Sequence, residues 1–132
     1  MLETADVVAF LPSRDLERSE RFFHGVLGLT VLSRSPYATV FRAGQATLRV
    51  TKVDDVVPQP FTVVGWVVVD LRAQAALLRE RGVDLVRYDG MGQDDHGIWA
   101  TPSGDLIAWF HDPDQNVLSL TEFAASPGHA DS

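Results

Sequence analysis

The stretch FHDPDQNVL, residues 110–118, decides the fold of this chain. It joins an apolar segment that ends near Phe110 to a second apolar segment that begins at Val117. The residues between them, DPDQN, are strong turn formers, because proline fixes its backbone and Asp and Asn side chains bind nearby backbone groups. The stretch therefore predicts a strand, a polar turn and a closing strand.

Upstream of this stretch, the first 52 residues predict a strand, a helix and three short strands. Pro12 ends the first strand, which spans residues 6–11, and Ser13 or Asp15 is expected to cap a helix that continues through Leu27. The three strands that follow are expected at 29–33, 37–42 and 46–52.

After the Pro-Gln-Pro break at residues 58–60 the same order returns. Asp70-Leu71 opens the second helix as Asp15-Leu16 opens the first, and a glycine closes each. The second-half strands are expected at 62–69, 83–88, 97–101, 106–111 and 117–123, one more than in the first half. We therefore predict an α+β chain of two tandem βαβββ modules, one at about 4–57 and one at about 61–123, followed by a disordered tail at 124–132.

Composition and charge exclude several classes of function and partner. The 132 residues include 11 basic and 18 acidic side chains, a net charge of -7, and no cysteine. One domain without disulfides or thiolate sites is expected. Nucleic acid is not expected as a partner, because its binding depends on clustered Lys and Arg. The longest apolar runs, such as 63–69, are too short to cross a bilayer, so no membrane partner is expected and the predicted location is cytoplasmic.

The duplicated βαβββ order resembles the vicinal oxygen chelate superfamily of glyoxalases, bleomycin resistance proteins and extradiol dioxygenases. Residues 110–120 are close to its F-x-D-P-D-G-N-x-x-x-L pattern, with Gln115 in place of the usual glycine. The resemblance covers the chain up to Phe123. It implies a single domain over 1–123 whose curved mixed sheets form a cup, with helices on the convex side and a ligand on the concave side, in a homodimer.

In metal-dependent members the resemblance implies one His, Gln or Glu ligand from each of four strands. Counting from the helix openings and the DPD turn gives Val8, Gly65 and Ser119 for three of these positions, and the fourth strand offers Arg49 for the remaining one. Val8 and Gly65 have no donor atom, Ser119 is a poor neutral ligand, and Arg49 would repel a cation. No metal ion or other cofactor is therefore expected, and chemistry that needs a metal would lack its Lewis acid.

Strand alternation and the resemblance place five candidate ligand-binding residues on the concave side: Phe10, Arg49, Trp109, His111 and Ser119. A guanidinium away from bulk water binds a carboxylate or phosphate through two parallel hydrogen bonds. The lining therefore favours a small, flat organic molecule with an anionic or strongly accepting group. We expect a metal-free binding protein that sequesters or senses such a molecule.

Several alternatives stay open. The main one is an enzyme of the same fold, of lyase, isomerase or dioxygenase type, that uses His96, His111 and nearby acids as a nonstandard metal site or either histidine as a general base. Arg49 has a structural alternative in an ion pair with Asp6, and Trp109 has one in ordinary core packing. A third hypothesis is an interaction domain that recruits a partner chain at a sheet edge.

Overall fold

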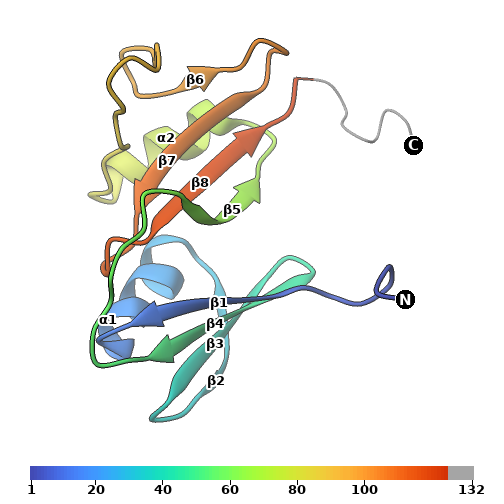
Figure 1. Cartoon of the computed structure of the whole chain (residues 1–132), viewed down its shortest axis with the longest axis vertical. Coiled ribbons are helices and arrows are strands. Elements are labelled where there is room, and N and C mark those ends of the chain that lie inside the picture. Colours follow the sequence, from blue (N-terminus) through green and yellow to red (C-terminus); the bar gives the residue numbers. More distant parts are fainter. Residues whose placement is uncertain (125–132) are drawn as a thin grey trace. The chain divides into compact units, whose positions relative to one another are not determined.

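The chain forms two units of one sheet each in a computed structural model that describes residues 1–124. Unit 1 consists of residues 1–59 and 112–116, and unit 2 of residues 60–111 and those from 117 onward. Each unit follows the order βαβββ with a four-stranded mixed sheet (Figure 1), which confirms the predicted α+β fold class. All of the predicted tail except Ala124 lies outside the described residues.

Unit 1 has the sheet order β1-β4-β3-β2, in which only the β1–β4 pairing is parallel. Its elements are β1 (Val8–Ser13), the α-helix α1 (Leu16–Glu20), the π-helix η1 (Arg21–Val26), β2 (Thr30–Arg34), β3 (Ala38–Ala43) and β4 (Ala46–Lys52).

The first helix begins at the predicted cap and changes type half-way. The Asp15 carboxylate accepts a hydrogen bond from the Arg18 backbone N–H at 3.1 Å, so Asp15 and not Ser13 is the N-cap. Beyond Glu20 the helix widens into a π turn, in which the Leu27 N–H donates to the Phe22 carbonyl. The predicted continuous helix is therefore present, but its second half is not α-helical.

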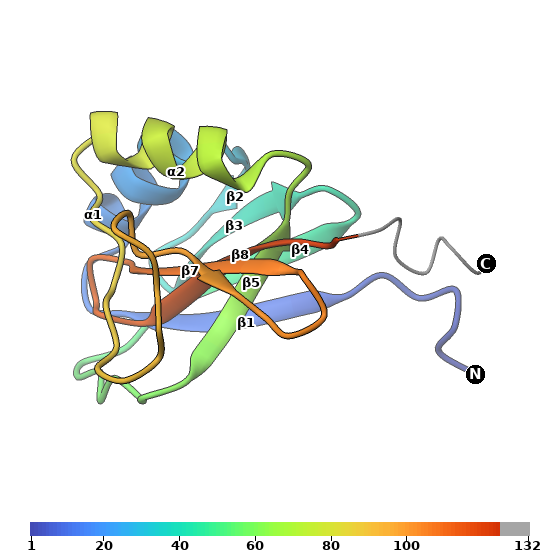
Figure 2. The same ribbon diagram turned by 90° about the horizontal axis from the view of Figure 1, so that it is seen from above.

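Unit 2 has the corresponding order β5-β8-β7-β6, with β5 parallel to β8. Its elements are β5 (Thr62–Val67), α2 (Leu71–Glu80), β6 (Trp99–Ala100), β7 (Leu106–His111) and β8 (Val117–Glu122). The helix α2 lies over β7 and β8 (Figure 2) and buries Leu71, Ala75 and Leu78 against them.

The strand predicted at 83–88 does not form. Only Val86 reaches the sheet, donating its N–H to the Trp109 carbonyl, and the Gln93 side chain takes the place of a neighbouring strand. The Gln93 amide accepts from the Tyr88 N–H at 2.7 Å and donates to the Val86 carbonyl at 2.9 Å. Because a side chain satisfies these backbone groups, the segment needs no ladder of hydrogen bonds.

The strand predicted at 97–101 is shortened to the two residues of β6. Gly97 has a φ of 86° and donates its N–H to the Asp94 carbonyl, so it belongs to a turn. At the other end, Thr101 donates its N–H to the Asp105 carbonyl and so begins the next turn.

The core of each unit lies between the sheet and its helix. The predicted alternation of faces agrees with the burial: Leu48, Val50, Leu118 and Leu120 are buried on the helix side, whereas Phe10 is exposed on the opposite, open face. None of the helices among residues 1–124 combines the length and the apolar character needed to cross a membrane.

Candidate functional site

The open face of unit 2 carries a row of three neighbouring residues across three strands, called here the unit 2 row. Gly65 on β5 lies opposite Ser119 on β8, and Ser119 lies opposite Trp109 on β7. Ala108 and Phe110, which flank Trp109 in the chain, are fully buried on the helix side. The row therefore combines two of the smallest side chains with the largest.

Trp109 is held in place by polar and aromatic contacts. Its indole Nε1 donates to the Thr62 Oγ1 at 3.0 Å, and because β8 lies between β7 and β5, the ring must pass over β8. Trp99 stacks on it at 6.2 Å and Tyr88 meets it edge-on at 5.4 Å between ring centroids. A fixed and partly exposed aromatic cluster of this kind suits the face of a flat organic ligand.

Gly65 is required by the Ser119 side chain. A Cβ atom at Gly65 would lie 2.4 Å from the Ser119 Oγ, closer than two such atoms can approach. Ser119 is buried, and within residues 1–124 its hydroxyl makes no hydrogen bond.

The corresponding row of unit 1 is Phe10 on β1, Arg49 on β4 and Val40 on β3. The Phe10 side chain is 66% exposed, a large fraction for an aromatic residue on a strand. Arg49 is half-buried, and in the described part of the chain it makes no ion pair, with Asp6 or any other acid. Its guanidinium is therefore available to an anionic group.

The strand register corrects one of the four positions inferred for a metal site. Gly65 stands five residues before the helix cap Asp70, and Phe10 stands five residues before the cap Asp15, whereas Val8 stands seven before it. Phe10 also faces Arg49 as Gly65 faces Ser119, so Phe10, not Val8, is the counterpart of Gly65.

This correction does not supply a metal ligand, because phenylalanine, arginine and glycine offer no suitable donor and serine only a weak one. The residues at these positions do not fit the divalent ion of metal-dependent relatives. Among residues 1–124, no three His, Asp or Glu side chains are grouped so that they could hold a metal ion.

The two candidate histidines lie on different parts of unit 2. His111 ends β7 opposite Val117, two residues beyond Trp109 and so on the same open face. His96 lines a separate cavity beside α2. The carboxylate of Asp94 binds the His96 backbone N–H and not its ring, so the loop is a turn and not an acid–base pair. The structure therefore does not bring the two histidines into one acidic cluster.

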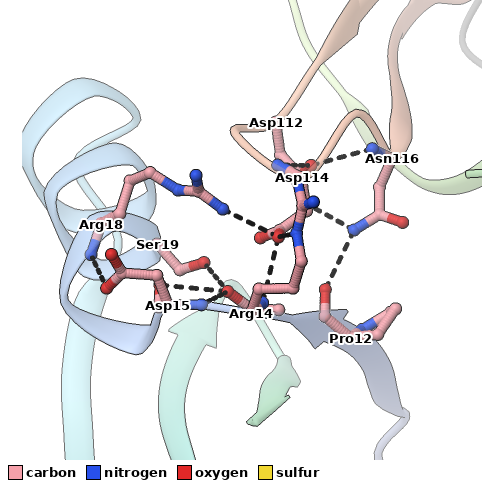
Figure 3. A network of polar contacts seen from close by, with 9 residues as sticks. Pro12, Arg14, Asp15, Arg18, Ser19, Asp112, Asp114 and Asn116 are labelled. Carbon is pink, nitrogen blue, oxygen red and sulfur yellow. Dashed lines mark hydrogen bonds and ion pairs between the residues drawn. The ribbon is translucent and has the colours of Figure 1, made fainter. Parts of the chain in front are cut away.

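The DPDQN turn belongs to unit 1 and is held there by a polar network (Figure 3). Oδ1 of the buried Asp114 accepts from the Arg14 N–H at 3.0 Å and from the Arg18 Nη2 at 2.8 Å. The Asn116 Nδ2 donates to the Pro12 carbonyl at 3.2 Å and to the Asp112 Oδ2 at 2.8 Å. These contacts fix the turn, and they give this part of the motif a structural role.

The two aspartates of the turn have pKa values shifted in opposite directions. Burial acts to raise the pKa of Asp114, but hydrogen bonds from Arg14 and Ser13 and the charge of Arg18 outweigh it and lower that pKa. Burial raises the pKa of Asp112, and the hydrogen bonds from Asn116 and Asp114 do not offset it.

Comparison with known proteins assigns this geometry to a family. The family model of the Glyoxalase/Bleomycin resistance protein/Dioxygenase superfamily matches residues 5–120. The chain belongs to this superfamily. No curated protein matches the chain significantly.

Solved structures of the glyoxalase superfamily share the fold at low sequence identity. TnmS3, an antibiotic binding protein from Streptomyces sp. CB03234, has a TM-score of 0.71 and 24% identity over 94% of this chain and 99% of its own. Lactoylglutathione lyase from Agrobacterium tumefaciens has a TM-score of 0.71 and 16% identity over 92% and 96%. A glyoxalase/bleomycin resistance protein/dioxygenase from Alicyclobacillus acidocaldarius has a TM-score of 0.69 and 19% identity over 95% and 96%. The fold is thus common to a binding protein and an enzyme.

Sequence reasoning missed three of the residues around Trp109, namely Thr62, Tyr88 and Trp99. Trp99 shares a face with Trp109 only because it pairs with Ile107, and this register cannot be read from the sequence. The one available signal was the aromatic character of Tyr88 and Trp99 in segments that precede β7.

Proposed function

We propose that this member of the glyoxalase superfamily is a metal-free binding protein for a small, flat organic anion, and that it acts as a homodimer. The observation that carries the proposal is the set of residues on the two rows: a fixed tryptophan beside a serine in unit 2, and an unpaired arginine beside an exposed phenylalanine in unit 1. These groups bind an aromatic ring and a carboxylate better than they bind a cation.

A matched pair of probes tests the proposal. Titration of the protein with 2-naphthoate and with neutral 2-naphthamide, followed by tryptophan fluorescence, compares two ligands of the same shape that differ in charge. We expect 2-naphthoate to bind at least tenfold more tightly, because a charge-assisted contact contributes about 1.5–3 kcal/mol. The stoichiometry of the titration shows whether the two rows serve one ligand molecule.

Substitutions of Arg49 and Trp109 test which residues bind the two probes. Arg49→Ala is expected to weaken 2-naphthoate by about 2 kcal/mol and leave 2-naphthamide unchanged, whereas Trp109→Ala is expected to weaken both. Lys52→Ala and Trp66→Phe serve as controls, because Lys52 is an exposed cation at the end of β4 and Trp66 stacks on the buried Phe110. Equal binding of the two probes, or an unchanged affinity in Arg49→Ala, would exclude the anion site.

Native mass spectrometry of the purified protein tests the absence of metal. We expect a dimer without a bound ion, and an additional organic mass would identify the class of ligand. One divalent ion per chain would contradict the proposal and favour the enzyme hypothesis.

A further inference from the structure

A separate basic cluster lies in unit 2, between α2 and the loop that leads to β6. Arg72, Arg79, His96 and Ile98 line a cavity of about 240 Å³, called here the basic cavity. Two of its four lining residues are arginines and a third is a histidine, in a chain whose net charge is -7. None of these residues belongs to the row of either unit.

The helix and the loop place these side chains together. Arg72 and Arg79 are seven residues apart on α2, which puts them on the same side of the helix, two turns from each other. The loop is fixed by the Asp94 carboxylate, whose Oδ1 accepts from the backbone N–H groups of His96 and Ile98, both at 2.9 Å.

The charge of Asp94 is already compensated. Its Oδ2 accepts from the Arg72 Nη1 at 2.9 Å. Burial acts to raise the pKa of Asp94, but hydrogen bonds from Ile98, Arg72 and His96 outweigh it and lower that pKa, so the carboxylate stays ionised near neutral pH. Within the described residues Arg79 has no ion-pair partner, so the cavity keeps an excess of positive charge.

The position of Arg72 is not explained by helix stability. It occupies the first turn of α2, where the helix dipole disfavours a cation. Arg79, in the last turn, lies where the dipole favours a cation, so the dipole alone explains only one of the two. The ion pair with Asp94 accounts for Arg72 there, whereas no described residue pairs with Arg79, whose guanidinium lines the cavity beside His96 and is available to an oxyanion.

We propose that the basic cavity binds a phosphate-sized oxyanion, either inorganic phosphate or the phosphoryl group of a larger molecule. Arg79 and His96 donate to the anion, and Arg72 adds its charge while it remains bound to Asp94. The cavity of about 240 Å³ is smaller than the pockets of about 300–1,000 Å³ that usually hold a drug-sized organic ligand, and it has room for a phosphate-sized group. This site does not depend on the proposed function of the two rows.

The test is a residue-resolved titration of the full chain. Inorganic phosphate is added to ¹⁵N-labelled protein at constant ionic strength, with chloride as the reference anion, and amide chemical shifts are followed. We expect saturable shifts at His96, Gly97, Ile98 and the neighbouring residues of α2. Arg79→Ala is expected to weaken phosphate binding at least tenfold, and His96→Ala several-fold, whereas Lys52→Ala in unit 1 leaves the affinity unchanged.

Glycerol 3-phosphate distinguishes the two sources of the anion. Tighter binding than inorganic phosphate indicates a phosphoryl group on a larger molecule, and weaker binding indicates the free ion. The proposal is overturned if chloride produces the same shifts, if the shifts appear only on unit 1 strands, or if Arg79→Ala binds phosphate as the unchanged protein does. Because the shifts are assigned residue by residue, an anion bound at Arg49 would not be mistaken for one in the basic cavity.

Discussion

The DPDQN turn holds one of its residues, Gln115, in an unfavourable backbone conformation. Its φ is 69°, in the left-handed region, and it is the only non-glycine residue with a positive φ among residues 1–124. A residue with a Cβ atom is about 1–2 kcal/mol less stable than glycine in this region. Glycine offsets part of this advantage, because it loses more backbone entropy when the chain folds. We therefore expect Gln115→Gly to raise the free energy of unfolding by about 1 kcal/mol in urea titrations.

Gln115→Ala separates this backbone effect from loss of the glutamine side chain. Alanine keeps the Cβ atom and is expected to give no stabilisation. A gain of equal size in both variants would show that the side chain, and not the backbone angle, determines the effect.

The close approach of Gly65 and Ser119 gives a second prediction at this scale. Gly65→Ala is expected to lower the free energy of unfolding by about 1–3 kcal/mol, because the new methyl group displaces the Ser119 hydroxyl. In a Ser119→Ala background the same substitution is expected to cost clearly less. Thermal unfolding of the four proteins of this double-mutant cycle measures the coupling, and additive effects would contradict the predicted contact.

Single residues also mark the limit of what the sequence predicts. Alternation along β7 correctly separates the half-buried Trp109 from the buried Ala108 and Phe110, because side chains on a strand alternate regardless of context, whereas on β8 both Leu118 and Ser119 are buried. The count to Val8 was wrong because Val8 lies seven residues before the cap Asp15, whereas Gly65 lies five residues before the cap Asp70. An equal count of five gives Phe10, and pairing across the sheet agrees with it.

At the scale of elements, the DPDQN turn makes stability depend on pH. The pKa of Asp114 is lower in the folded chain than its ordinary value of 3.8, so its ionised form stabilises the fold above that value. This contribution is lost as the pH falls below about 3.8 towards the folded pKa. Asp112 has the opposite effect. Because its pKa is raised in the folded chain, its protonation at low pH favours the folded state.

Asp114→Asn isolates the first of these effects. At pH 7 the variant is expected to lose about 2–3 kcal/mol of unfolding free energy, because Arg14 and Arg18 lose their ionised partner. The difference from the unchanged protein should shrink when urea unfolding is repeated below pH 3.8. A difference that stays constant with pH would show that the charge of Asp114 is not what stabilises the turn.

The sequence predicts a helix or strand correctly where neighbouring residues determine it. The prediction fails where a side chain from elsewhere in the chain determines the structure. Asp15 and Asp70 open both helices as expected, because capping involves only the next few residues. The segment at 83–88 has the composition of a strand, yet Gln93 binds its backbone groups. Nothing in the local pattern of that segment indicates this competition.

At the scale of the whole molecule, both parallel-paired strands lie at sheet edges and carry exposed apolar side chains. β1 and β5 end their sheets in the strand order, with Phe10 exposed on one and Val67, at 70% exposure, on the other. Proteins usually cover or charge such edges, because they otherwise pair with other chains. We therefore expect light scattering to give twice the chain mass of 14.5 kDa.

Val67→Asp is expected to shift this dimer towards the monomer, whereas Leu77→Asp on α2 is expected to leave it intact. Circular dichroism of each variant verifies that the fold is retained. A monomer at all concentrations of the unchanged protein would contradict the homodimer.

The assignment of residues 112–116 to unit 1 bears on the use of this protein as a two-fragment reporter. A cut at the natural break after Gln59 would leave the first fragment without the acceptors of Arg14 and Arg18, which the second fragment carries. The first fragment would lack five residues of its unit, whereas the second would contain all of unit 2, although the chain consists of two repeats. Reassembly of the two fragments would then depend on residues 112–116, and substitutions of Asp114 could adjust the affinity between the fragments without altering either sheet.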